Sequence, residues 1–145
     1  MFIPAKRRLV LPLSVLAVLL SLGAGRGQDA EHRKPSLTLT ALPSIAFAPA
    51  RVKFSVELHE GDDDYEDFYC ASVEWDWDDG TTSQWTRDCD PYRAGRSRIM
   101  RHFTAVHTYA FPDSYRPTFR LKKRDKVVGQ VRTEVDVRSG GTGQD

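Results

Sequence analysis

Stretches in which apolar and polar residues alternate with a period of two dominate this chain. The alternation is cleanest at residues 52–58, where four apolar side chains are separated by Lys53, Ser55 and Glu57. This pattern is typical of a β-strand with one buried face and one solvent-facing side. The same pattern indicates strands at residues 37–41, 69–78, 115–122 and 127–137, and two further strands are predicted at residues 81–86 and 98–104. Because no stretch after the first 27 residues has the helical spacing of three and four, we predict an all-β fold, an antiparallel β-sandwich of about seven strands.

The apolar positions of the predicted strands should meet in one core, where each buried side chain contributes about 1.5 to 3 kcal/mol. The expected core residues are Leu37, Leu39, Val52, Phe54, Val56, Leu58, Val73, Trp75, Tyr115, Phe119, Val131 and Val135. Pro117 is the exception within these strands, because proline has no N–H to donate to a ladder. We therefore expect that the strand is bulged at Pro117, or that the position of the missing N–H faces away from any partner strand.

A tight turn is predicted at Asp79-Gly80, between two of the strands. Asp-Gly is favoured in two-residue hairpin turns, whose central residues need positive φ. If these are the two turn residues, the numbers of facing residues add up to 159, which places Cys70 opposite Cys89 within disulfide distance. These are the only two cysteines, and a redox site would more often show C-x-x-C. We therefore predict a disulfide between Cys70 and Cys89.

Two blocks stand out by composition and order: W-D-W-D-D-G at residues 75–80, and H-T-Y-A-F-P-D-S-Y at residues 107–115. They resemble the motifs of the PKD (polycystic kidney disease) domain family, although Trp77 stands where phenylalanine is usual, and Asp78 and Asp113 replace glycines. The resemblance implies an immunoglobulin-like sandwich over most of the chain. The residues that carry it are Trp75, Asp76, Trp77, Asp79, Gly80, His107, Tyr109, Pro112 and Tyr115.

The resemblance implies a structural role for these motif residues. His107 would pack and form hydrogen bonds near one end of the sandwich, and either Tyr109 or Tyr115 would make a tyrosine-corner contact with the backbone. Domains of this family usually mediate contacts outside the cytoplasm, commonly as parts of larger proteins. The resemblance therefore implies a binding or scaffolding role.

The first 27 residues have the three regions of a secretory signal peptide. Basic residues 6–8 precede an apolar run at residues 9–22, which is shorter than the roughly 20 residues that span a bilayer. Small residues follow, and cleavage after Gly25 or after Gly27 fits the pattern. We predict a signal peptide at 1–27, a flexible linker at 28–35, a sandwich domain at 36–138 and a disordered tail at 139–145. The mature protein would be secreted, periplasmic or on the cell surface, with no stable membrane span after processing.

Loss of the signal peptide changes the charge of the chain. The whole sequence has 21 basic and 20 acidic residues, and removal of Lys6, Arg7, Arg8 and Arg26 leaves 17 against 20, a formal net charge of −3. Sequence-independent phosphate binding needs a concentrated basic surface. We therefore expect no nucleic-acid partner.

Candidate catalytic and metal-binding residues are few. Asp62, Asp63 and Asp64 of an acidic loop offer oxygen ligands for calcium, but their spacing differs from that of the D-x-D-x-D-G loop. The alternative is a solvated acidic loop without a cofactor. Asp76 and Asp78 share a strand face and could act as paired carboxylates, yet an outer strand face is expected to be polar. With no Ser/His/Asp arrangement and no phosphate loop, the sequence has no enzyme signature.

Aromatic and basic residues carry the sharpest binding hypothesis. Trp85 and Tyr92 are expected to be exposed, and could stack on a sugar ring or anchor a protein partner. Two basic stretches, at residues 93–101 and 120–126, could attract an acidic polysaccharide or protein. We predict an exported non-catalytic module that binds a protein or a glycan. The alternatives are a secreted enzyme inhibitor that acts through the loop at residues 89–95, and a carboxylate-based hydrolase.

Overall fold

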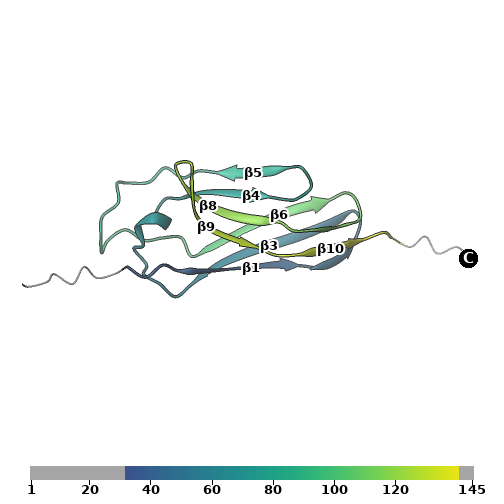
Figure 1. Ribbon diagram of the computed structural model, residues 1–145, viewed down its shortest axis with the longest axis horizontal. Coiled ribbons are helices and arrows are strands. Elements are labelled where there is room, and N and C mark those ends of the chain that lie inside the picture. Colours follow the sequence, from purple (N-terminus) through teal and green to yellow (C-terminus); the bar gives the residue numbers. More distant parts are fainter. Residues whose placement is uncertain (1–31, 141–145) are drawn as a thin grey trace, which may run out of the picture. The chain divides into compact units, whose positions relative to one another are not determined.

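The computed structural model describes residues 32–140 of the chain. The predicted signal peptide lies outside these residues, as do parts of the predicted linker and tail. The described residues form ten strands and one short 3₁₀ helix (Figure 1): β1 (Ser36–Leu42), β2 (Ile45–Phe47), β3 (Ala50–His59), η1 (Glu66–Phe68), β4 (Ser72–Asp76), β5 (Thr82–Trp85), β6 (His102–Tyr109), β7 (Asp113–Tyr115), β8 (Thr118–Lys123), β9 (Lys126–Arg132) and β10 (Val135–Arg138). Within residues 32–140 no helix has the length and apolarity needed to cross a membrane. The prediction of an all-β fold is confirmed.

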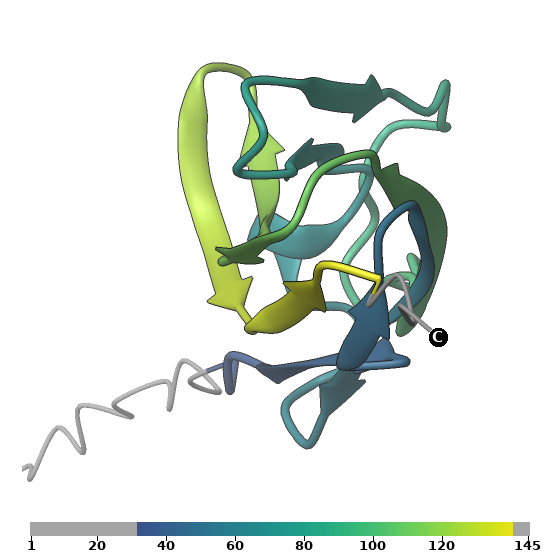
Figure 2. The ribbon, with the colours of Figure 1, turned by 90° about the vertical axis from the view of Figure 1, so that its right-hand side faces the viewer.

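The strands lie in two layers that face each other across the core. One layer is the sheet β1-β3-β6, and the other contains the sheets β5-β4-β8-β9 and β2-β10-β7. All pairings are antiparallel except that of β2 with β10. Figure 2 views the domain from the end that carries β10, drawn in yellow, with the blue N-terminal strands beneath it. The layers meet where the ring centroid of Phe54 on β3 lies 5.9 Å from that of Trp75 on β4.

Strands β7 to β10 form one long hairpin that passes from one sheet to the next. The β7–β10 pair, in which Tyr115 faces Val135, continues in the same register into the β8–β9 pair as far as Leu121, where a bulge shifts the register. The hairpin ladder is interrupted at Pro117. Its carbonyl accepts a hydrogen bond from the Thr133 N–H at 3.2 Å, but proline has no N–H with which to donate one. The single strand predicted around Pro117 is therefore divided into β7 and β8. This division is one reason why the described residues form ten strands rather than about seven.

The turn between β4 and β5 differs from the predicted one by one residue. Asp76 faces Thr82, so the numbers of facing residues add up to 158 rather than 159. Positive φ occurs at Asp78, with 62°, and at Gly80, with 84°. The connection is therefore longer than the predicted Asp79-Gly80 turn. The prediction fails because aspartate tolerates the left-handed conformation, so both Asp78 and Asp79 are suited to a turn.

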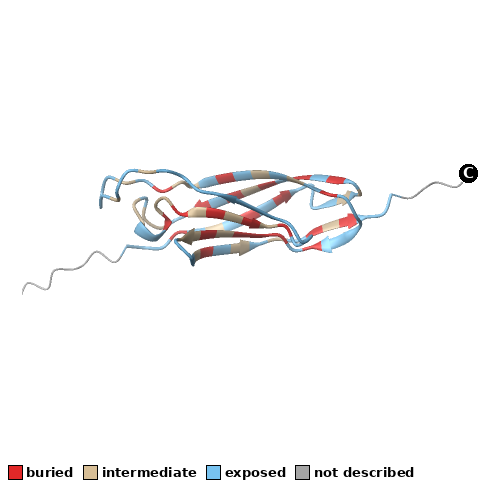
Figure 3. Ribbon diagram, turned by 90° about the horizontal axis from the view of Figure 1, so that it is seen from above, coloured by how far each residue is buried: buried red, intermediate tan, exposed pale blue. Residues whose placement is uncertain are grey.

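The core between the layers agrees closely with the predicted one. Leu37 and Val131 are partly buried, and the other expected core residues are all buried. Figure 3 shows buried positions alternating with exposed ones along the strands. The additional buried apolar residues are Ala41, Ala50, Phe68, Ala71, Trp77, Ile99, Phe103, Tyr109, Leu121 and Val137. Phe68 and Ile99 lie outside the strands, where no periodicity marks them.

Two further elements differ from the sequence prediction. The strand expected at residues 98–104 begins later, as β6, because residues 86–101 form a long connection without regular strands. We call this connection the 86–101 loop. The short strand β2 was not predicted, because three residues are too few to show a period.

Gly61 is expected to tolerate no side chain, unlike Gly95. Both have positive φ, 59° and 71°. A β-carbon on Gly61 would collide with the backbone nitrogen of Pro35 and lie 2.7 Å from the Arg33 carbonyl oxygen, whereas one on Gly95 would meet nothing within 4 Å. Gly61→Ala should therefore lower the free energy of unfolding by about 2 to 4 kcal/mol, and Gly95→Ala by about 1 kcal/mol. Urea denaturation measures both values, and equal losses would contradict this expectation.

Candidate functional site

The aromatic motif residues of the two sequence blocks, Trp75, Trp77, Tyr109 and Tyr115, are buried in the core, and His107 packs against them. The Trp77 ring stacks on Trp75, with centroids 5.0 Å apart, and on His107, with centroids 4.5 Å apart. Trp77 Nε1 donates to Ser83 Oγ at 2.9 Å, which satisfies the one polar atom of the buried indole. The stack connects the end of β4 in one layer with β6 in the other. These rings therefore hold the two layers together, and Trp77 is too deeply buried to contact a ligand.

Asp79 ties the turn between β4 and β5 to β6. Its Oδ2 lies 2.7 Å from His107 Nε2, and its Oδ1 accepts the Thr81 hydroxyl at 2.5 Å. Burial raises the pKa of Asp79, but the hydrogen bonds from Thr81 and His107 outweigh burial and hold the pKa below its usual value. A carboxylate that stays ionised suits an anchor for this turn and does not suit a general acid.

Tyr115 makes a contact of the tyrosine-corner kind. Its hydroxyl donates to the Phe111 carbonyl at 2.9 Å, across the turn that contains Pro112. Tyr109 is fully buried and stacks on Tyr115 with ring centroids 4.1 Å apart. Within residues 32–140 the Tyr109 hydroxyl has no hydrogen-bond partner, and burial raises its pKa. The two tyrosines thus fill the core and leave little surface for a ligand.

The carboxylates considered for paired acid and base chemistry have separate partners. Asp76 pairs with Arg120 at 3.3 Å on the outer face of its sheet. Arg120 also pairs with Glu74 at 2.9 Å. Asp78 Oδ2 instead accepts the backbone N–H of Arg116 at 2.8 Å. These carboxylates neutralise cations or fix loops, and they do not converge on one reacting atom.

The three aspartates of the acidic loop also bind different partners. The shortest contact of each carboxylate is 2.6 Å, to the Arg33 N–H for Asp62, to Arg101 Nε for Asp63 and to the Gly95 N–H for Asp64. Among residues 32–140, no group of three His, Cys, Asp or Glu side chains is arranged to hold a metal ion. The aspartates therefore act as anchors between loops.

The acidic loop fixes the 86–101 loop at the end of the domain that also carries η1 (Figure 1). The Asp64 carbonyl accepts the Tyr92 hydroxyl at 2.8 Å, and the Asp63 carbonyl accepts the Ile99 N–H at 2.8 Å. The hydrogen bond from the Gly95 N–H lowers the pKa of Asp64. The long connection is thus held in place without strand pairing.

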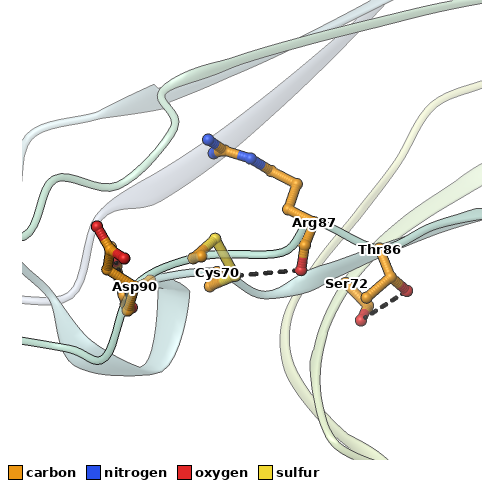
Figure 4. The surroundings of a disulfide bond; sticks show 7 residues. Cys70, Ser72, Thr86, Arg87 and Asp90 are labelled. Carbon is orange, nitrogen blue, oxygen red and sulfur yellow. Dashed lines mark hydrogen bonds between the residues drawn. A yellow bond between two sulfur atoms is a disulfide. The ribbon is translucent and has the colours of Figure 1, made fainter.

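The disulfide between Cys70 and Cys89 fixes the start of the same loop. The Cα atoms of the two cysteines are 6.1 Å apart, and the predicted pair is confirmed. The register argument for it is wrong, because the β4–β5 ladder extends only to the pair Val73 and Trp85. Cys70 reaches its partner from a separate turn in which its φ is 53°. Figure 4 shows the disulfide together with Arg87 and Asp90, which lie near it in the chain.

Trp85 lies at the rim of an open groove between the two layers. β5 and β6 are the edge strands of their sheets. A groove of about 290 Å³ is lined mainly by Trp75, Trp85, Met100, His102, Phe103 and Thr104. The Trp85 side chain remains 49% exposed. The groove therefore combines an apolar floor with an accessible indole ring.

Tyr92, the other residue predicted to bind a ligand, does not lie in this groove. Its ring centroid is 5.6 Å from that of Tyr69, and its hydroxyl donates a hydrogen bond to the Asp64 carbonyl. Tyr92 lines a different cavity, next to Tyr65 and His32. The structure therefore does not bring Trp85 and Tyr92 together.

A polar pocket of about 520 Å³ lies along the 86–101 loop. Its charged lining residues are Arg87, Asp88, Asp90, Arg93, Arg96 and Arg98. Arg87 is two residues from Trp85, and Arg98 is two residues from Met100, so the pocket begins within about 7 Å of the groove along the chain. The sequence shows most of these arginines only as part of a basic stretch, and no pattern of neighbouring residues predicts that they share a pocket.

Comparison with known proteins bears on the fold. No protein-family model matches the chain, and no curated protein matches it. Among solved structures the chain is similar to the PKD domain of an M14-like peptidase from Thermoplasmatales archaeon SCGC AB-540-F20, with 12% identity and a TM-score of 0.48 over 72% of this chain and 97% of that one. It is also similar to the CARDB domain of the PF1109 protein from Pyrococcus furiosus in complex with di-metal ions, with 14% identity and a TM-score of 0.52 over 76% of this chain and 97% of that one. A PKD domain is thus among the structural matches, and the second match shows that this chain shares the fold of a CARDB domain.

Proposed function

We propose that this protein is an exported, non-catalytic, PKD-like module that binds a protein or a carbohydrate outside the cytoplasm. The sandwich domain, at residues 36–138, would follow a signal peptide at residues 1–27 and a linker, and precede a short tail. The disulfide supports this location, because such bonds persist in oxidising compartments. The mature protein would be secreted, periplasmic or held at the cell surface.

The observation that carries the proposal is the exposed indole of Trp85. The chain has three tryptophans, and Trp75 and Trp77 are buried in the core. Only Trp85 presents its ring to solvent, above a groove with an apolar floor. Exposed aromatic rings of this kind are enriched in binding hot spots and stack on sugar rings. The groove is therefore the contact surface of the proposed module.

A binding role also accounts better than turnover for the acidic residues. Asp79 is held ionised by hydrogen bonds from Thr81 and His107, and Asp76 is paired with Arg120. Hydrolysis by two carboxylates needs one that keeps its proton near neutral pH and another that lies opposite it. Asp76 and Asp79 are instead arranged so that they anchor neighbouring strands and turns of the sandwich.

Replacement of Trp85 by alanine is expected to weaken ligand binding at least 10-fold, because a hot-spot aromatic contributes about 2 kcal/mol. The protein is produced with export, so that the disulfide forms, and is applied to an array of polysaccharides and to a panel of immobilised extracellular proteins. The affinity for each ligand found is then measured by calorimetry for the parent and the variant.

Phe111→Ala is the matched control for this experiment. Phe111 is also an exposed aromatic residue, with 74% of its surface accessible, but it lies in the turn before β7 and does not line the groove. Its affinity should stay within about twofold of the parent value, since surface truncations away from a binding site have small effects. The proposed function fails if no ligand in either panel depends on Trp85.

A further inference from the structure

Three arginines of the 86–101 loop, Arg87, Arg93 and Arg96, outnumber the two aspartates that line the same pocket. No carboxylate of residues 32–140 forms an ion pair with Arg87, Arg93 or Arg96, whereas Arg98 in the same pocket pairs with Asp63 at 3.4 Å. The three side chains belong to exposed residues. Like charges gathered in one pocket raise the local positive potential and attract anions.

The acidic loop does not neutralise these arginines, because its carboxylates are already used. Asp63 is shared between Arg98 and Arg101, and Asp64 accepts the Gly95 N–H. The acidic loop therefore contributes to the position of the 86–101 loop and leaves its remaining positive charges free. The acidic stretch of the sequence thus anchors the 86–101 loop, and the basic stretch supplies arginines that can contact a ligand.

The backbone of the loop that carries these arginines is also held in place. The disulfide at Cys89 and the hydrogen bond of the Tyr92 hydroxyl fix the loop from outside. Within the loop, the Arg93 N–H donates to Ser97 Oγ at 2.8 Å, and the Ser97 N–H donates to the Arg93 carbonyl at 2.8 Å. A loop that is ordered before binding loses little conformational entropy when a ligand arrives.

Two aspartates in the pocket distinguish between classes of anionic ligand. Asp88 and Asp90 line the pocket, and neither forms an ion pair within residues 32–140. Their oxygens can accept hydrogen bonds from hydroxyl groups. A ligand that carries anionic groups together with many hydroxyls matches both kinds of lining residue. An acidic peptide matches the arginines but brings few donors for the aspartates.

We propose that this pocket binds an acidic polysaccharide. Its carboxylate or sulfate groups would accept hydrogen bonds from Arg87, Arg93 and Arg96, whose planar guanidinium groups match such anions. A neighbouring sugar ring would stack on Trp85, which lies about two residues' length from the pocket. This inference rests on the proposed binding function and names the ligand class of the same surface.

The test measures binding of the exported protein to dextran sulfate and to polygalacturonate by calorimetry, with neutral dextran as the uncharged counterpart. Binding to the sulfated or the carboxylated polymer, and none to dextran, is expected. The variant R87A/R93A/R96A should bind at least 10-fold more weakly, because it loses the charge-assisted hydrogen bonds of three guanidinium groups. Higher salt should weaken parent binding as well, because the charges are exposed.

The control variant R51A/K53A/R132A removes the same charge from exposed positions on β3 and β9, and its affinity should stay within about twofold of the parent value. Thermal melting establishes that both triple variants are folded. The inference is overturned if neither acidic polymer binds, if the control loses as much affinity, or if poly-L-glutamate binds more tightly than both polymers. A neutral ligand whose binding depends on Trp85 would then still support the proposed function, so the two failures can be told apart.

Discussion

Trp77→Ala is expected to lower the free energy of unfolding by about 4 kcal/mol, whereas Trp85→Ala lowers it by less than about 1 kcal/mol. Trp77 is only 2% exposed, and its ring packs against Phe54, Trp75 and His107. Alanine at this position leaves a cavity in the core, while at Trp85 it leaves open surface at a sheet edge. Urea denaturation followed by the fluorescence of the remaining tryptophans measures both values.

A third variant separates ring packing from hydrogen bonding. Trp77→Phe places at this position the residue that is usual in the resembled PKD motif. It keeps an apolar ring but loses the hydrogen bond to Ser83, so the expected loss is about 1 to 2 kcal/mol. Similar losses for alanine at Trp77 and at Trp85 would contradict the assignment of one tryptophan to the core and the other to the surface.

The double variant Cys70→Ser/Cys89→Ser is expected to lower the free energy of unfolding by about 3 kcal/mol, because the cross-link no longer restricts the unfolded chain. The two cysteines are 19 residues apart in the sequence, which places the closed loop in the range to which this value applies. Urea denaturation of the double variant and of the oxidised parent measures the difference. Replacing both cysteines avoids a free thiol that could form other disulfides.

Hydrogen exchange of the same double variant shows where the constraint acts. Amides of the 86–101 loop should exchange faster than in the parent, because Cys89 holds its first part, while the central strand β3 serves as the internal control. A double variant as stable as the parent, with unchanged exchange in the loop, would show that the acidic loop alone fixes this segment.

The fold could be predicted from the sequence largely because burial alternates along its longer strands. Val52, Phe54, Val56 and Leu58 on β3 are buried as the pattern predicts. The length of the β4–β5 turn could not be predicted, because two adjacent aspartates are both suited to it. The disulfide was predicted correctly from a wrong register, since its strongest support was that Cys70 and Cys89 are the only two cysteines.

The candidate site was harder to predict, because it depends on contacts between loops far apart in the sequence. Trp85 is exposed, as expected. The hydroxyl of Tyr92, which was also expected to be exposed, instead donates a hydrogen bond to the carbonyl of Asp64, 28 residues away. Neither loop shows a periodicity that would indicate such a contact. The distinction between paired and unpaired arginines likewise appears only when Asp63 is placed beside Arg98 and Arg101.

The chain passes from one layer to the other between β1 and β2, and this crossing has a consequence for proteolysis. β1 is at the edge of the sheet β1-β3-β6, and β2 is at the edge of the sheet β2-β10-β7. A single cleavage after Phe47 that released this segment would remove one strand from each layer at once. β3 and β10 would then present unpaired backbone groups, which are templates for aggregation with other chains. The segment from Ser36 to Phe47 thus keeps one side of β3 and one side of β10 paired.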